Sequence, residues 1–148
     1  MTEETLQRTA VGIFKEFYEP LIIESSWNGI DLSGIKDREE ISKIIANFYQ
    51  QGGLKGSSDL KVYLPDMKMI HIELKRPGRK GGQSPEQKKL EKKLKSIGHR
   101  YYLCNDLESI FNAINANLSL DYRTELVHKY RGEYSMKAVA HQLGVKDI

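Results

Sequence analysis

The hydrophobic pattern of the chain switches at Asp59 from helical spacing to strict alternation. The runs "DLKVYL" and "MIHIELK" alternate apolar and polar residues, and "PDMK" between them carries turn-forming residues. Alternation with a period of two is typical of strands that bury one face, so residues 59–64 and 69–75 are predicted to form a β-hairpin. A hairpin alone is marginally stable in water, so other elements must cover its apolar face.

Two helical patterns precede the hairpin. Residues 3–18 repeat apolar side chains at helical spacing, with Thr2 as a possible cap. Residues 37–53 do the same, with Asp37 as a possible cap and two glycines as the stop. The polar cluster "SSWNGIDLSG" at residues 25–34 is predicted to form a loop between them.

A helix, a strand and a second helix follow the hairpin. Ser84 and Gln87 in "SPEQ" form a capping-box pattern, so a helix is predicted from there to Gly98. The run "HRYYLC" predicts a third strand, and Asp106 is a suitable cap for a helix through Ile114. The order strand, strand, helix, strand, helix predicts a mixed α/β fold.

Length and composition are those of a globular protein. The chain has 148 residues, 39% apolar and 29% charged, which fits one domain with a real core. It lacks both an uninterrupted apolar run of about 18 residues and the start of a signal peptide, so we expect a cytoplasmic protein without membrane contact. The lone Cys104 has no partner for a disulfide or a zinc site and is predicted to be a buried core residue.

Positive charge is concentrated in one part of the chain. Residues 75–100 contain ten Lys and Arg against two Glu, whereas the rest contains thirteen basic and eighteen acidic residues. Such an asymmetry indicates a polyanionic partner, with nucleic acid the usual candidate. A solvated lysine-rich helix face is the alternative for residues 88–95, and the sequence leaves both interpretations open.

Strand parity brings Asp59 to Glu73. If Leu60 pairs with Ile72 to match the two apolar faces, the same register sets Asp59 opposite Glu73, with Cβ atoms about 4.5 to 5.5 Å apart. Two carboxylates that close are normally neutralised by a cation or by a proton. Oxygen ligands suit Mg²⁺, and Lys75 on the same face is placed to stabilise negative charge on a phosphate.

A simpler interpretation exists for Glu73 and Lys75. Glu and Lys two residues apart are common on any half-exposed sheet, where they face solvent. The addition of Asp59 in register and of the basic, glycine-rich "RPGRKGG" favours a metal-dependent phosphodiesterase site. The adjacent Pro65 and Asp66 are interpreted as turn residues at the far tip of the hairpin.

Four blocks, "GLKGSSDL", "IHIELKRP", "QSPEQKKLEKKLKSIGH" and "YYLCNDLES", resemble in order and spacing the VRR-NUC family of PD-(D/E)xK nucleases. The similarity covers about residues 53–115, with a weaker match for the first helix, and is greatest to the small stand-alone forms common in phages. One departure is Ser58, which stands where the motif has proline before its acidic residue.

This resemblance implies a restriction-endonuclease-like core of α-β-β-β-α-β type, a central mixed sheet flanked by helices. It implies hydrolysis of DNA with Mg²⁺ or Mn²⁺ in the cytoplasm of a bacterium or phage-infected host. The implied metal ligands are Asp59, Glu73 and the backbone carbonyl of Leu74, and the implied catalytic residues are Asp59, Glu73, Lys75 and Gln87. For Gln87, the capping box is a second, compatible role.

An acidic residue of the first helix often completes such centres in the family, and Glu4 is the expected one, with Glu3 and Glu16 as rivals. The expected DNA-binding residues are Lys55, Arg76, Arg79, Lys80, Lys88 and Lys92. The stand-alone members resemble Holliday-junction resolvases, which implies a homodimer that cuts branched DNA. A general duplex or single-strand nuclease and a non-cleaving DNA-binding module of the same fold are the alternatives.

The expected domain organisation is one nuclease domain at residues 1–120 and a helical extension at residues 121–148. The extension resembles the first helix and turn of a helix-turn-helix unit, and the alternative is a terminal helix that packs on the domain or on a second subunit. Trp27 is interpreted as a core or interface residue, with stacking on a base as the alternative.

Overall fold

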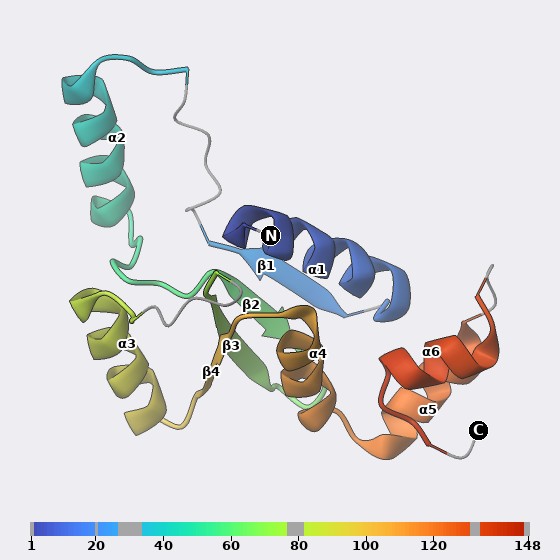
Figure 1. Ribbon diagram of the computed structural model, residues 1–148. Helices are drawn as coiled ribbons and strands as arrows, with labels where there is room; N and C mark the ends of the chain where they lie inside the picture. Colours follow the sequence, from blue (N-terminus) through green and yellow to red (C-terminus); the bar gives the residue numbers. More distant parts are fainter. Residues whose placement is uncertain (1, 20, 27–33, 77–81, 131–133, 147–148) are drawn as a thin grey trace.

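The computed structural model describes residues 2–19, 21–26, 34–76, 82–130 and 134–146 (Figure 1). They form a central sheet with helices on both sides, as predicted. The sheet has the order β1 (Ile22–Ser25), β2 (Leu60–Tyr63), β3 (Met69–Leu74) and β4 (Arg100–Cys104). The first two pairs are antiparallel and β3 pairs with β4 in parallel, so the sheet is mixed.

The register of the hairpin is the one that strand parity predicts. Leu60 pairs with Ile72 and Val62 with Ile70. All four side chains, together with Leu74, are at most 1% exposed. A slip of one residue would turn one apolar row toward the polar face, and this cost is what specifies the register.

Two helices cover the apolar face of the sheet. In α1 (Glu3–Phe17), Thr2 caps the N-terminus, and Leu6, Ala10 and Phe14 are buried. In α4 (Leu107–Ala116), Asp106 is the cap, and the buried apolar residues include Ile110 and Ile114. These side chains form one cluster with the apolar residues of β2 and β3, and Cys104 is buried in it as predicted.

The polar side of the sheet is covered by α3 (Pro85–Ser96). The helix begins with the predicted capping box, in which Ser84 and Gln87 each accept a hydrogen bond from the other's backbone N–H. It forms the crossover between β3 and β4, which a parallel pair requires. The first turn of α3 therefore lies near the carboxyl end of β3.

Two elements differ from the sequence expectation. No residue pattern indicated the strand β1, although the α-β-β-β-α-β order implied by the resemblance includes it. It is a four-residue edge strand whose Ile22 is 61% exposed, so it has no alternating burial pattern to detect. The predicted second helix exists as α2 (Arg38–Gln50), but none of its residues, all of which the structure describes, is buried. Figure 1 shows α2 extending away from the sheet.

The C-terminal residues form α5 (Leu120–Lys129) and α6 (Met136–Gln142), which pack against the domain. Leu126, Val127, Val139 and Leu143 are buried in the same cluster as the sheet residues. Within the part of the chain that the structure describes, no helix is both long and apolar enough to cross a membrane.

Candidate functional site

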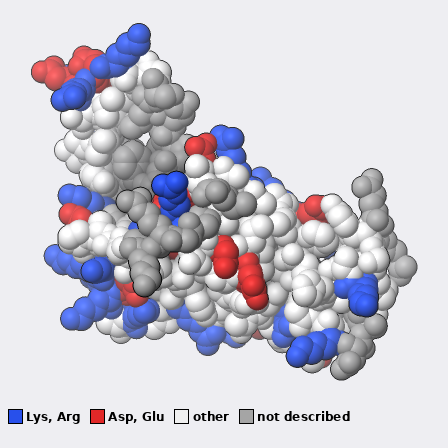
Figure 2. Space-filling model, viewed as in Figure 1, with Lys and Arg blue, Asp and Glu red and all other residues white. Residues whose placement is uncertain are grey.

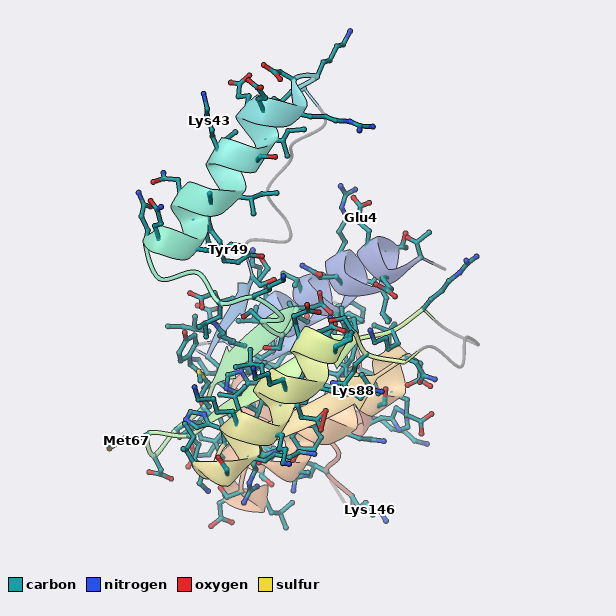
Figure 3. The ribbon with its side chains drawn as sticks, turned by 90° about the vertical axis from the view of Figure 1, so that its left-hand side faces the viewer. Glu4, Lys43, Tyr49, Met67, Lys88 and Lys146 are labelled. Atoms are coloured by element: carbon teal, nitrogen blue, oxygen red, sulfur yellow. The ribbon has the colours of Figure 1, made fainter. Side chains whose placement is uncertain are left out.

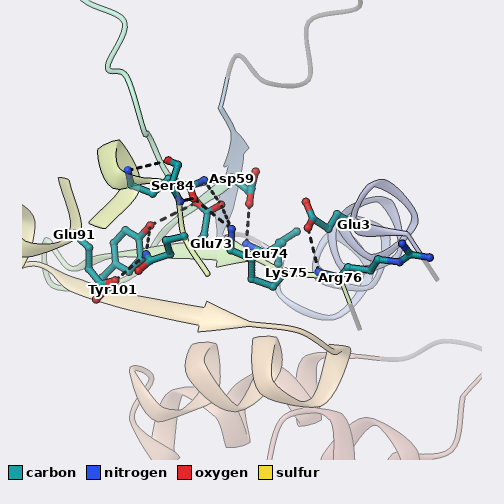
Figure 4. A network of polar contacts seen from close by, with 11 residues as sticks. Glu3, Asp59, Glu73, Leu74, Lys75, Arg76, Ser84, Glu91 and Tyr101 are labelled. Atoms are coloured by element: carbon teal, nitrogen blue, oxygen red, sulfur yellow. Dashed lines mark hydrogen bonds and ion pairs between the residues drawn. The ribbon is translucent and has the colours of Figure 1, made fainter. Parts of the chain in front are cut away.

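Two carboxylates meet at the end of the hairpin. Asp59 directly precedes β2, and its Oδ2 accepts a hydrogen bond from the backbone N–H of Leu74 at 2.7 Å (Figure 4). Glu73, the neighbour of Leu74 in β3, is only 2% exposed. The predicted proximity of the two acids is therefore present, and the Asp59 carboxylate is held by the backbone of the partner strand.

The Glu73 carboxyl has a strongly perturbed pKa. Burial, followed by the charge of the nearby Asp59, raises this pKa from 4.5 to about 8, against a smaller lowering by the Lys75 ammonium. Without a bound cation, Glu73 holds a proton at neutral pH, because a second buried negative charge beside Asp59 is unfavourable. A cation at this place would replace that proton.

Gln87 joins α3 to both strand residues. Its Nε2 donates to Oε1 of Glu73 at 2.6 Å, and its Oε1 accepts from Nζ of Lys75 at 3.3 Å. The same Oε1 accepts the backbone N–H of Ser84 at 2.9 Å, so Gln87 serves the capping box and the site at once. Nζ of Lys75 lies 3.9 Å from Oε1 of Glu73, and the lysine side chain is 16% exposed.

Tyr101, which the sequence analysis did not identify as a site residue, contacts Glu73. The hydroxyl of Tyr101 in β4 donates to Oε2 of Glu73 at 3.5 Å, and it accepts from Nε2 of Gln83 at 3.4 Å. Its side chain is buried, and this burial together with the charge of Glu73 raises the pKa of the hydroxyl. Alternation places Tyr101 on one face of β4, but only the parallel register with β3 places that face beside Glu73.

The acidic residues of α1 lie in three different places. The carboxylate of Glu3 reaches the end of β3, where Oε1 accepts the backbone N–H of Arg76 at 3.1 Å (Figure 4). Its charge also raises the pKa of Glu73. Glu4, the expected ligand, forms an exposed ion pair with Arg8 at 2.7 Å, and Glu16 accepts a hydrogen bond from Tyr130 at 3.4 Å.

A chain of polar side chains made of Ser58, His71 and His99 supports the segment directly before Asp59. Oγ of Ser58 lies 3.3 Å from the carbonyl oxygen of Leu60 and 3.3 Å from Nδ1 of His71, whose Nε2 lies 3.3 Å from Nδ1 of His99. Burial, His99 and Lys61 lower the pKa of His71 to about 4, so the ring is neutral at pH 7. Because Ser58 donates to Leu60, a consistent chain has Nδ1–H of His71 donating to Ser58 and Nδ1–H of His99 donating to His71.

The residues present fit a hard divalent ion. No group of three or more His, Cys, Asp or Glu side chains is close enough to hold a metal within the described ranges. Asp59 and Glu73 nevertheless supply a pair of carboxylates, and the raised pKa of Glu73 reflects its burial beside this second acid. Such a pair, completed by backbone or water oxygens, is the ligand set that Mg²⁺ takes in proteins.

The expected DNA-binding residues surround this site only in part. Lys88 and Lys92 are exposed on α3, and Arg76 is exposed directly after β3. Lys55 lies 3.6 Å from Glu86, which partly neutralises it. Figure 2 shows Lys and Arg side chains gathered over α3. The predictions for Arg79, Lys80 and Trp27 fall outside the described residues.

Comparison with known proteins identifies the fold. No family model matches the chain, and no curated protein matches it. A solved structure described as a VRR_NUC domain protein matches with a TM-score of 0.58 and 17% sequence identity, over 80% of this chain and 88% of that chain. The chain therefore has the fold of that VRR-NUC domain protein, and the resemblance seen in the sequence is confirmed at the level of fold.

Proposed function

We propose that the protein is a metal-dependent DNA endonuclease that hydrolyses phosphodiester bonds at the Asp59–Glu73 site. The observation that supports it most is the buried Glu73 carboxylate, which contacts Gln87 and Lys75 beside a second carboxylate. A structural ion pair on a half-exposed sheet needs neither the burial of Glu73 nor two acids together. The VRR-NUC fold supports the same reading.

The side chains have distinct roles in this proposal. Asp59, Glu73 and the backbone carbonyl of Leu74 would hold Mg²⁺ or Mn²⁺, with Glu3 as the candidate for a third acidic group in place of Glu4. The ion would act as a Lewis acid on the phosphate and lower the pKa of water.

Three further side chains prepare the site. Gln87 and Tyr101 each donate to one carboxylate oxygen of Glu73, which keeps the carboxylate in one orientation. The Lys75 ammonium is the positive group nearest Glu73 in the network, and it would stabilise negative charge that builds on the phosphate in the transition state. Arg76, Lys88 and Lys92 would bind backbone phosphates with little sequence preference.

Branched DNA is the proposed substrate and a homodimer the proposed form. A two-fold dimer places two active sites symmetrically, as a four-way junction requires. The apolar stripe of α2, with Ile41, Ile44 and Ile45 only half-buried, supports a second subunit as its cover. General duplex or single-strand cleavage, and DNA binding without cleavage, are the competing outcomes of the test below.

The test compares two carboxylates of the same hairpin. Labelled four-way junction, duplex and single-stranded DNA are incubated with the wild-type protein, Glu73→Gln and Asp66→Asn, each with Mg²⁺ and with EDTA. We expect Glu73→Gln to lower the cleavage rate by at least about a hundredfold, because an oriented group that acts on the transition state contributes on that scale. EDTA should abolish wild-type cleavage.

The matched control is Asp66→Asn, since Asp66 is exposed in the turn at the other end of the strands. This variant should cleave like the wild type. Equal cleavage by Glu73→Gln would show that the site is elsewhere, and DNA binding without cleavage by the wild type would leave the non-cleaving module. Paired, symmetric nicks confined to the junction would separate a resolvase from a general nuclease.

A further inference from the structure

A basic hollow lies at the end of the sheet opposite the candidate site. It has a volume of about 320 Å³, and its lining includes Lys68, His99 and Arg100. Among the described residues that line it there is no Asp or Glu. The Arg100 guanidinium donates a hydrogen bond to Oδ1 of Asn117, another lining residue, which holds the charge at the rim.

Both β3 and α3 extend between the hollow and the candidate site, so the two places are about one strand length apart. Glu73 lies near the carboxyl end of β3, whereas Lys68, directly before β3, lines the hollow. Five residue steps along a strand span about 17 Å. The twelve residues of α3, from the turn that bears Gln87 to the end beside Ile97, span about 18 Å.

Exposed lysines connect the two places. Lys88, Lys89, Lys92 and Lys93 are all exposed along α3. In Figure 3, α3 faces the viewer with Lys88 beside it, and Met67 projects at the end of the molecule toward which the helix runs. The positive charges therefore form a row from the candidate site to the hollow.

Exposed apolar side chains stand at the rim of the hollow. Met67 is fully exposed at 102%, and Ile97 is 68% exposed. Met67 also has a φ of 63°, in the left-handed region that L side chains rarely adopt. Asp66 and Met67 both have positive φ as the central residues of the hairpin turn, and this turn exposes the Met67 side chain. Exposed apolar side chains next to cations occur in proteins that contact the minor groove of DNA.

We propose that this hollow is a second DNA contact, which binds the phosphate backbone of a duplex arm about five base pairs from the phosphate that is cut. The spacing follows from the separation of about 17 Å and a rise of about 3.4 Å per base pair. The proposal rests on DNA being the substrate of the Asp59–Glu73 site. It adds that the protein holds one arm along α3, so that a shortened arm loses affinity stepwise.

Binding of fluorescent four-way junctions, measured by anisotropy in EDTA, tests this contact. One junction has long arms, and in the others one arm is shortened in steps. Lys68→Glu should weaken binding of the long-armed junction roughly fivefold at 0.1 M salt, and it should lower the slope of log affinity against log salt by about 1. The wild-type protein should lose a similar amount when one arm falls below about five base pairs.

The control is Lys146→Glu, which makes the same charge change at an exposed residue after α6, a helix on the opposite side of the molecule from α3 in Figure 1. It should bind like the wild type. Equal losses of affinity in Lys68→Glu and Lys146→Glu would overturn the second contact. So would a loss from Lys68→Glu that stays the same on the junction with the shortest arm. In both results, cleavage at the Asp59–Glu73 site would remain and the proposed function would stand. Absence of all DNA binding by the wild type would overturn both proposals.

Discussion

Ionisation of the Glu73 carboxyl lowers the free energy of unfolding of the metal-free protein. Its carboxyl is buried beside Asp59, and Gln87 donates to one oxygen at 2.6 Å. Burial and the charge of Asp59 raise its pKa to about 8, so the folded chain keeps a proton there that the unfolded chain has released above pH 4.5. A site built to receive a cation has this property, because its acids are arranged for a charge that is supplied on binding.

The stability of the metal-free protein should therefore depend on this residue. The folded protein binds more protons than the unfolded chain between pH 4.5 and about 8, so its stability falls as the pH rises through that range. Glu73→Gln removes this fall. In EDTA at pH 8 the variant should melt at least about 3 °C above the wild type, with a smaller difference at pH 5.

The control for this titration is Glu86→Gln. Hydrogen bonding at the start of α3 and the Lys55 ammonium lower the pKa of Glu86, so its charge is favourable in the folded state. Its removal should give no gain at pH 8. A Glu73→Gln variant that melts below the wild type at pH 8 would mean that the carboxylate is already paired without metal.

At the scale of elements, the site depends on how the first turn of α3 meets the segment before β2. Gly56, in that segment, has a φ of +79°, and a Cβ built there would lie 2.6 Å from the backbone carbon of Glu86 and 2.8 Å from the backbone nitrogen of Gln87. Only glycine permits this approach. The contact joins the segment that ends in Asp59 to the helix that carries Gln87.

Gly56→Ala should consequently disturb the candidate site by displacing α3. The added methyl group must push α3 away from the segment, which we expect to lower the free energy of unfolding by about 1 to 3 kcal/mol. Cleavage should fall as well, because Gln87 moves relative to Glu73. Denaturant unfolding and the cleavage assay measure the two effects.

Gly52→Ala separates the steric contact from the backbone conformation. Gly52 has a φ of +104°, yet a Cβ there meets no described atom within 4 Å. This variant should lose stability from the unfavourable φ but retain cleavage. Comparable cleavage by both alanine variants would contradict the role given to the Gly56 contact.

At the scale of the whole molecule, the C-terminal helices are tied to the domain through one buried tyrosine. The hydroxyl of Tyr18, at the end of α1, lies 2.8 Å from Oδ1 of Asn115 and 3.0 Å from the carbonyl oxygen of Gln142. Asn115 in α4 also donates to that carbonyl at 3.0 Å. The ring stacks on Phe14 and Phe111, so α1, α4 and α6 meet at a single residue.

Tyr18→Phe should destabilise the whole domain. The ring stays in place, but the buried oxygen of Asn115 loses its donor, which costs about 1 to 3 kcal/mol. We expect one cooperative transition at lower denaturant concentration, because α6 shares the core with the sheet. Tyr63→Phe, whose exposed hydroxyl contacts Glu24 at 3.1 Å, should change the stability little. Separate early melting of the C-terminal helices would argue against a shared core.

Much of the fold follows from local patterns. Helix caps at Thr2, Asp37, Ser84 and Asp106 and the alternation of the hairpin are local signals, and the structure has each element where they predict it. No local pattern indicated strand β1, which only the strand order of the resemblance implied. A short edge strand depends on its neighbour for its hydrogen bonds, and four residues carry no period.

The sequence by itself determined that Asp59 and Glu73 are neighbours, because side chains alternate along a strand and the apolar face permits one register. The tertiary structure alone decided what surrounds them. The rotation of α1 brings Glu3 rather than Glu4 to the end of β3, and the parallel pairing of β4 brings Tyr101 to Glu73. Such placements depend on the packing of whole elements against one another, and no local pattern in the chain records that packing.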